Sequence, residues 1–328
     1  MAESARWDSA YHAPVMATEI VRLLRDAPAA AHRDTTSHPR SHPLALDGTL
    51  GGGGHSLALL DAGFRVVATD RDPHALAAAS VRLQDYQHDG RFRALLANYA
   101  DVADLDAHEP FDAVLLDLGI SSHQIDDLAR GFSFREGAAL DMRMGTDART
   151  DAATFLNDTD ERELARVFRA YADEPRASRL AREIARRRAT RPFATSDDLV
   201  GAIRGALGPR TGPGDFARLF QAVRVEVNDE LARLEHALPA LRDRLSPGGR
   251  IAVIAYHSGE DRLVKHAFRE WSAGCVCPPR QPLCTCGHVA LGETVTRRAV
   301  EADDAERARN PRARSAKLRV WQRAEAAA

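Results

Sequence analysis

LALDGTLGGGGHSLALLDAGFRVVATD, residues 44–70, is the segment from which the fold can be predicted most directly. It holds an apolar run that ends in Asp47, four consecutive glycines, a helical pattern of apolar residues, and a second apolar run that ends in Asp70. This order of strand, glycine loop, helix and strand is typical of half a nucleotide-binding α/β unit. Glycines let backbone approach a ligand, the helix start offers unpaired N–H groups, and the final acid can bind a ribose diol.

The glycine loop fits a dinucleotide only in part. In the fingerprint G-x-G-x-x-G, Gly51 and Gly53 match, but Ser56 stands at the third glycine position. The carboxylate of Asp47 beside the loop would also repel a pyrophosphate, whereas it suits a sulfonium cation and a methionine ammonium group. The segment therefore favours S-adenosylmethionine as the cofactor. An NAD-like ligand and a purely structural glycine turn are the alternatives.

The overall composition is that of an ordinary globular protein. The chain has 328 residues, of which 44% are hydrophobic and 28% charged, with a formal net charge of −2. This length allows one large α/β domain and a smaller one. Nearly all positive charge is arginine, a bias that either a GC-rich genome or phosphate binding explains. No apolar run reaches the ~20 residues of a membrane span and the N-terminus lacks a signal-peptide core, so we expect a cytoplasmic protein with no membrane partner.

Further polar side chains follow other predicted strands. Asp117 ends the apolar run FDAVLLD, and His257 follows the run RIAVIAY. Because ligands of open α/β sheets bind outside the carboxyl ends of the strands, both are predicted to face the same crevice as Asp47 and Asp70. Tyr99, just beyond RFRALLANY, is placed to lie against an adenine ring. An aromatic residue at the rim with no ligand is the alternative for Tyr99.

The alternation of strands and helices stops in the middle of the chain. From residue 126 to residue 216 the sequence shows loops, capping patterns and apolar stripes at helical spacing, but no clear strand. We therefore expect an inserted α-helical domain at residues 126–216, between two parts of the α/β domain at residues 1–125 and 217–328.

One segment of this insertion is strongly basic. Residues 176–191 hold seven arginines and a single acid, Glu183. The imbalance of sign favours a phosphate-binding face over an ordinary solvated surface. Three of the arginines fall on one helix face and are the candidate RNA contacts: Arg179, Arg182 and Arg186.

All four cysteines lie in CVCPPRQPLCTCG, residues 275–287. Four thiolates this close can bind zinc in a tetrahedron, but the usual zinc knuckle has the spacing C-x2-C, whereas this segment has C-x-C-x6-C-x-C. A zinc site and reduced thiols in a surface loop both stay open, and a disulfide is not expected in a cytosolic protein. The candidate metal ligands are Cys275, Cys277, Cys284 and Cys286.

Taken together, the motifs closely resemble one family, the bacterial 16S rRNA cytosine-N4 methyltransferases called MraW or RsmH. The resemblance runs from YHAPVM through DGTLGGGGHS, TDRDP, LLDLGISSHQIDDLARGFSF, LDMRM, FQAVRVEVNDEL and YHSGEDRLVK to NPRARS. It implies a Rossmann-like α/β sheet of an S-adenosylmethionine-dependent methyltransferase, with an inserted α-helical domain that helps to recognise RNA. By position, it implies cofactor contacts at Gly53, Gly54, His55, Asp70, Tyr99, Asp117 and Gln124.

The same resemblance implies methyl transfer to N4 of a cytosine in the decoding centre of 16S rRNA, within the small ribosomal subunit or its precursor, by a monomer or homodimer. DNA amino-methyltransferases use a (D/N/S)PP(Y/F) motif after the fourth strand, but this chain has DLGISS there. The catalytic candidates are therefore Asp117, Asp141 in LDMRM, and His257. A non-catalytic cofactor-binding assembly factor and a methyltransferase for a small molecule or a protein are the alternative functions.

Overall fold

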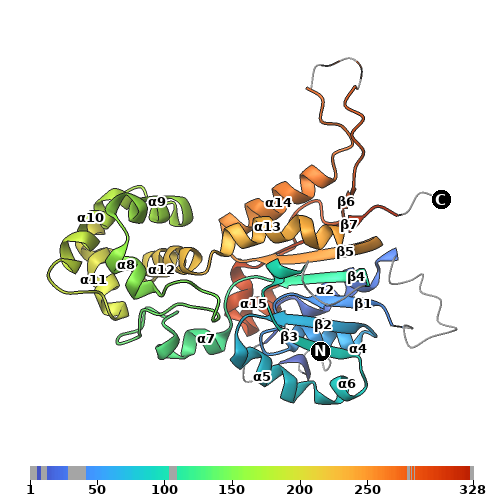
Figure 1. Cartoon of the computed structure of the whole chain (residues 1–328), viewed down its shortest axis with the longest axis horizontal. Helices are drawn as coiled ribbons and strands as arrows, with labels where there is room; N and C mark the ends of the chain where they lie inside the picture. Colours follow the sequence, from blue (N-terminus) through green and yellow to red (C-terminus); the bar gives the residue numbers. More distant parts are fainter. Residues whose placement is uncertain are drawn as a thin grey trace. The chain divides into compact units, whose positions relative to one another are not determined.

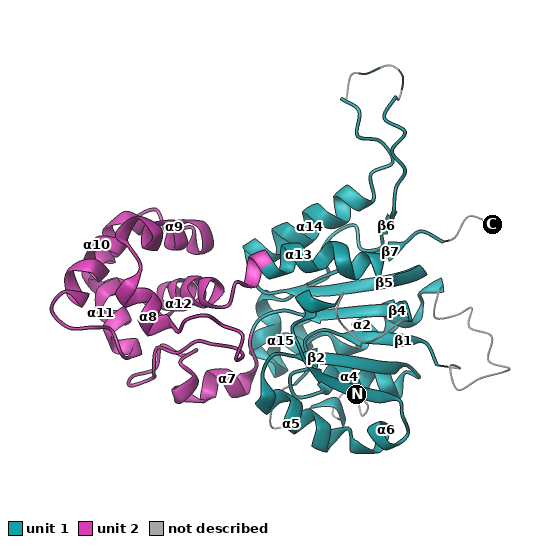
Figure 2. Cartoon of the chain, viewed as in Figure 1, with its two compact units in different colours: residues 1–119, 233–328 teal, residues 120–232 magenta. Residues whose placement is uncertain are grey.

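The chain forms two compact units, shown in different colours in Figure 2. The first is an α/β unit made of residues 1–119 and 233–328, and the second is a helical unit made of residues 120–232. Figure 1 labels the helices and strands of both. The computed structural model describes residues 6–8, 13–28, 42–102, 109–278, 281, 283 and 285–325.

The α/β unit is built around a seven-stranded sheet with the order β3-β2-β1-β4-β5-β7-β6. Strands β1 to β5 run parallel to one another, whereas β7 is antiparallel to both β5 and β6. The predicted Rossmann-like α/β sheet is therefore confirmed. The strands are β1 (Leu44–Asp47), β2 (Arg65–Asp70), β3 (Phe92–Leu96), β4 (Phe111–Asp117), β5 (Leu245–Ala255), β6 (Gly292–Thr294) and β7 (Lys317–Arg323).

Each face of the sheet has its own buried cluster, because successive side chains of a strand point to opposite faces. Ala45 and Leu115 pack in one cluster with α2, α4 and α5. Leu46 and Val114, their neighbours in the chain, pack in the other with α13 and α14. The helices of this unit are α2 (Ala17–Arg25), α4 (Gly54–Asp61), α5 (Pro73–Arg82), α6 (Gln84–His88), α14 (Ser258–Trp271), α15 (Asp304–Arg309) and most of α13 (Glu230–Asp243), with short 3-10 helices η1 (Tyr99–Asp101) and η3 (Pro311–Ser315).

The segment at residues 44–70 folds as its pattern predicted, into β1, the glycine loop, α4 and β2. Gly53 is the N-cap residue of α4 and has φ 75°, a left-handed conformation that side chains with a Cβ rarely adopt. The next helix, α5, begins at Pro73, and the side chain of Asp72 caps it by accepting a hydrogen bond from the backbone N–H of His74.

The helical unit has a hydrophobic core of its own, in which Leu164, Phe168, Leu180 and Leu199 are fully buried. Glu174, only 2% exposed, accepts a hydrogen bond of 2.7 Å from Arg218 inside this unit. None of the described helices is both long and apolar enough to cross a membrane. The unit contains α7 (Ser122–Asp126), η2 (Leu128–Arg130), α8 (Ala152–Asp158), α9 (Glu161–Ala172), α10 (Ala177–Arg188), α11 (Ser196–Leu207) and α12 (Pro213–Val227).

The helical unit extends further than the range 126–216 expected from the sequence, since it covers residues 120–232. The C-terminal difference arises because Leu219, Phe220 and Val223 of α12 belong to the core of the helices before them. The sequence pattern did not reveal that α12 packs in the core of the helical unit, whereas the next helix, α13, packs against the sheet of the α/β unit.

The apolar pattern from about Phe220 to Leu245 predicts one long amphipathic helix, but this prediction is wrong, because α12 and α13 are separate helices. Asp229 between them has φ 54°. The side-chain amide of Asn228 donates to the carbonyl of Met142 at 2.7 Å, and its oxygen accepts from the N–H of Met144 at 2.8 Å. Asn228, which lies between the two helices, therefore anchors the loop that contains LDMRM.

Candidate cofactor-binding and active site

Three carboxylates lie at the carboxyl ends of neighbouring parallel strands. Asp47, Asp70 and Asp117 are the last residues of β1, β2 and β4. The strand order reverses between β1 and β4, which is where open α/β sheets bind their ligands. Burial raises the pKa of all three, and repulsion from Asp47 raises the pKa of Asp70 and of Asp117 further. The edge of the sheet therefore presents concentrated negative charge.

Asp47 fixes the glycine loop to the end of β1. Its carboxylate is fully buried and accepts hydrogen bonds from the hydroxyl of Ser56 at 2.7 Å and from the N–H of Thr49 at 3.2 Å. Ser56 stands where the dinucleotide fingerprint has its third glycine. The departure from the fingerprint is therefore explained, because a glycine at this position would leave the buried carboxylate without its hydroxyl partner.

Asp70 is held in place by two backbone N–H groups. Gly51 donates to one carboxylate oxygen at 2.8 Å and Asp72 to the other at 2.9 Å. A carboxylate oxygen has two acceptor positions, so each oxygen keeps one for a ribose hydroxyl. The contact with Gly51 also ties the glycine loop to the acid. This geometry fits the role predicted for Asp70 in cofactor binding.

Burial raises the pKa of Asp70 to about 6, so cofactor binding should depend on pH near this value. Hydroxyl groups of a ribose bind the ionised carboxylate best, so protonation of Asp70 must oppose cofactor binding. We expect the dissociation constant for S-adenosylmethionine to rise about tenfold as the pH falls from 7 to 5. Calorimetry at several pH values measures this slope, and the slope should be smaller in Asp70→Asn. A wild-type dissociation constant that is independent of pH would contradict the prediction.

Asp117 lies between His55 and Tyr256. The Tyr256 hydroxyl donates to one carboxylate oxygen at 2.7 Å, and His55 Nδ1 is 3.5 Å from the other. His55 Nε2 is 2.9 Å from the carbonyl oxygen of Val15, which only accepts hydrogen bonds, so Nε2 carries a proton. Burial raises the pKa of Asp117, whereas the charge of Arg312 acts against this rise.

The glycines predicted to contact the cofactor have close neighbours within the chain. A Cβ on Gly53 would lie 3.2 Å from the side chain of Ala79 in α5, and a Cβ on Gly54 would lie 3.1 Å from the carbonyl of Trp7. Tyr99 is packed beside the same loop, because a Cβ on Gly48 would lie 2.9 Å from its Cβ. Larger residues at these positions would crowd the neighbouring atoms, which explains why glycine stands there. Direct contact of Gly53, Gly54 and Tyr99 with the cofactor stays a prediction.

Two predicted site residues, Gln124 and Asp141, belong to the helical unit. Gln124 and Ser121 form a capping box at the start of α7. In it, the N–H of Ser121 donates to the Gln124 side-chain oxygen at 2.9 Å. Both oxygens of Asp141 accept hydrogen bonds from the Arg143 guanidinium, at 2.9 and 2.6 Å. Partial burial acts to raise the pKa of Asp141, but Arg143 outweighs it and holds this pKa below its usual value. Asp141 is therefore a weak proton acceptor.

His257 follows β5, and within the described residues its buried Nε2 makes no hydrogen bond, so its catalytic role stays a prediction. It is the N-cap residue of α14, and its Nε2 lies 3.2 Å from a carboxylate oxygen of the buried Glu260. The residue before it, Tyr256, is the one that reaches Asp117. Tyr256 was not among the site residues predicted from the sequence. The signal was present, because a tyrosine that directly follows a buried strand has a polar tip at the ligand edge of the sheet.

The three acidic side chains at the strand ends of the α/β unit fit S-adenosylmethionine. The cofactor carries a sulfonium and an ammonium group, and three buried carboxylates with raised pKa values gain from nearby positive charge. A pyrophosphate would meet repulsion from the same groups. The crevice between β1 and β4 therefore matches a cationic nucleoside better than a dinucleotide.

Comparison with known proteins agrees with this site. The model of the MraW methylase family matches residues 9–324. A protein of Gemmatimonas aurantiaca is 60% identical over 316 residues, covering 96% of each chain. A protein of Heliobacterium mobile is 42% identical over 323 residues, covering 95% of this chain and 99% of the relative. Both relatives are named ribosomal RNA small subunit methyltransferase H. This chain therefore belongs to the MraW methylase family.

Proposed function

We propose that this chain transfers a methyl group from S-adenosylmethionine to N4 of a cytosine in the decoding centre of 16S rRNA. As a member of the MraW methylase family it is a methyltransferase that depends on S-adenosylmethionine. Its relatives are named for the RNA of the small ribosomal subunit. The observation that carries the proposal is the group of Asp47, Asp70 and Asp117 at the carboxyl ends of β1, β2 and β4, a binding place for the cationic methyl donor.

The exocyclic amine of cytosine is a weak nucleophile, because its lone pair is delocalised into the ring. When bound, the cofactor supplies an electrophilic methyl group on its sulfonium sulfur. The protein must hold N4 in line with this methyl group and stabilise the positive charge that N4 gains. Asp117 supports both tasks, since its carboxylate accepts a hydrogen bond from an N4–H group while Tyr256 holds it in place.

A proton must also leave N4 as the new N–C bond forms and the S–C bond breaks. Asp117 is suited to accept it, because burial raises its pKa and its second oxygen faces His55. The target base must be turned out of its stack to reach this edge of the sheet, at a cost of a few kcal/mol. Contacts with the RNA backbone compensate for this cost.

We propose that arginine side chains of α10 contact the RNA. Their interactions within the chain reduce the number of candidates. Arg186 binds Glu183 through two hydrogen bonds, and Arg188 donates to backbone carbonyls. By contrast, Arg179 and Arg182 are exposed, and no hydrogen bond or ion pair joins either side chain to the described part of the chain. These two are therefore the most available for phosphate groups.

Replacing Arg179 and Arg182 with alanine is expected to weaken RNA binding and to flatten its dependence on salt. Each lost phosphate contact should reduce the slope of log affinity against log salt by roughly 0.7 to 0.9. Cofactor affinity should not change. The control is Arg162→Ala, an exposed arginine flanked in sequence by Asp160, Glu161 and Glu163. An unchanged slope in the double variant, with normal folding, would show that the α10 face is only a solvated surface.

A ribosomal RNA substrate implies that the reaction takes place in the cytoplasm, on free rRNA, on the small subunit or on its precursor. We propose a monomer or homodimer as the active form. Two other functions compete with the proposal: an assembly factor that binds the cofactor without catalysis, and a methyltransferase for a small molecule or a protein.

The decisive experiment maps N4-methylcytosine in small-subunit rRNA from cells with and without this protein. We expect the modification at one cytosine of the decoding centre to disappear without the protein. Purified protein should restore it in vitro, and a comparison of naked RNA with isolated subunits identifies the substrate. If the protein binds S-adenosylmethionine but methylates no form of the RNA, the assembly-factor alternative replaces the proposal.

A further inference from the structure

The loop between α14 and β6 belongs to the α/β unit (Figure 1), and the structure describes its residues 272–278, 281, 283 and 285–291. A hydrogen bond of 2.8 Å from the N–H of Leu291 to the carbonyl of Trp271 closes its base. The described residues of the loop form no helix or strand. Val276, Leu283 and Val289 are 58, 77 and 75% exposed, so the loop has little apolar core of its own. Long loops without secondary structure of their own are uncommon and are usually functional or linker segments, and small structures that lack an apolar core are stabilised by disulfides or a structural metal ion.

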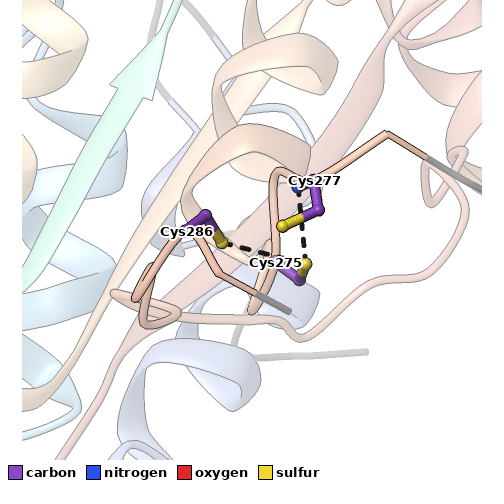
Figure 3. A group of neighbouring side chains, drawn as sticks. All are labelled: Cys275, Cys277 and Cys286. Carbon is purple, nitrogen blue, oxygen red and sulfur yellow. Dashed lines mark hydrogen bonds between the residues drawn. The ribbon is translucent and has the colours of Figure 1, made fainter. Parts of the chain in front are cut away.

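Three thiols gather in this loop (Figure 3). The sulfur atoms of Cys275, Cys277 and Cys286 all lie within 4.8 Å of one another, and those of Cys275 and Cys286 are 3.8 Å apart. Two of the sulfurs accept hydrogen bonds from the backbone N–H two residues further on. Cys277 donates to Cys275 at 3.4 Å, and His288 donates to Cys286 at 3.5 Å.

The distance of 3.8 Å between the sulfurs of Cys275 and Cys286 matches a metal site and not a disulfide, and the sulfur of Cys277 lies close enough to join the same site. In a tetrahedron with Zn–S bonds of about 2.3 Å, two sulfur ligands lie about 3.8 Å apart, whereas a disulfide requires about 2.05 Å. Backbone N–H groups that point at sulfur stabilise the thiolate form that a metal ion needs. Thiolate ligands and a tetrahedral arrangement favour zinc over magnesium or calcium.

We propose that Cys275, Cys277 and Cys286 bind one Zn²⁺ ion, which holds the loop between α14 and β6 in place. A structural zinc site has four ligands. The chain has four cysteines, and the remaining one, Cys284, lies outside the described residues. None of the three ligands belongs to the methyl-donor crevice, so this site stands independently of the proposed function.

The test measures zinc in the full-length protein by mass spectrometry of the metal. We expect about one zinc ion per chain, and less than about a tenth of that in a Cys275→Ser, Cys286→Ser double variant. Val289→Ser, which changes an exposed side chain of the same loop, is the matched control and should keep its zinc.

Thiol labelling with iodoacetamide gives a second readout that does not depend on how the variants fold. In the wild type, the three cysteines should resist labelling until a chelator removes the metal, and added zinc should restore the protection. Wild-type protein without zinc whose thiols react freely would overturn the proposal. So would a mass that is about 2 Da lower because of a disulfide, or iron in place of zinc.

Discussion

Asp117→Asn is expected to lower the single-turnover rate of methyl transfer by roughly 100-fold or more, even with saturating cofactor. Asparagine has the shape of aspartate and its oxygen still accepts the hydrogen bond from Tyr256, so the packing around the site should be preserved. What it removes is the negative charge next to N4 and the group that accepts the proton. Both matter most in the transition state, where N4 becomes positive.

The charge of Asp117 has a second effect, which the experiment must separate from the first. A carboxylate near the sulfonium stabilises the bound cofactor before transfer, and this alone does not speed the chemical step. Single-turnover rates measured over a range of cofactor concentrations distinguish the two roles. If saturation restores the wild-type rate, Asp117 is only a cofactor ligand, and Asp141 or His257 becomes the catalytic candidate.

Asp141→Asn is the matched control for this experiment. The Asp141 carboxylate is already bound by Arg143, and its pKa is held below the usual value despite partial burial. It is therefore a poor proton acceptor, and we expect a much smaller loss of rate than in Asp117→Asn. A larger loss in Asp141→Asn would reverse the assignment of the two residues.

The sequence was sufficient to predict the sheet and its acidic edge, because these depend on local patterns. A buried strand appears in the sequence as an apolar run. An acid at the carboxyl end of such a strand lies at the edge of the sheet where ligands bind, whatever the details of packing. Asp47, Asp70 and Asp117 were found in this way, and all three end strands in the structure.

The contacts that set the chemistry of the site were harder to predict, because they join residues far apart in the chain. Tyr256 reaches Asp117 only because β4 and β5 pair with Asp117 opposite Ile254. The imidazole of His55 is held by the carbonyl of Val15, which no periodicity reveals. The ion pair of Arg186 with Glu183 is different, since residues three apart on a helix are neighbours and the sequence contained that information.

The largest effect on cofactor binding is expected for Asp70→Ala, which should weaken S-adenosylmethionine binding at least tenfold. Each hydrogen bond from a ribose hydroxyl to a charged acceptor contributes roughly 1.5 to 3 kcal/mol, and the substitution removes two. The N–H groups of Gly51 and Asp72 also lose their acceptor, so the glycine loop loses a contact that holds it in place. Both effects act in the same direction.

Calorimetry with the purified variant measures this loss, and thermal unfolding shows whether the fold is intact. Asp89→Ala, which removes an exposed acid of the same unit, is the control and should bind the cofactor like the wild type. Should Asp70→Ala fail to fold, Asp70→Asn keeps one oxygen acceptor, for the N–H of either Gly51 or Asp72, while it weakens the bonds to ribose. A folded Asp70→Ala with an unchanged dissociation constant would exclude the ribose contact, because no other change in that variant compensates for two lost bonds. Tighter binding of NAD than of S-adenosylmethionine by the wild type would contradict the cofactor assignment, since the acidic edge formed by Asp47, Asp70 and Asp117 should repel a pyrophosphate.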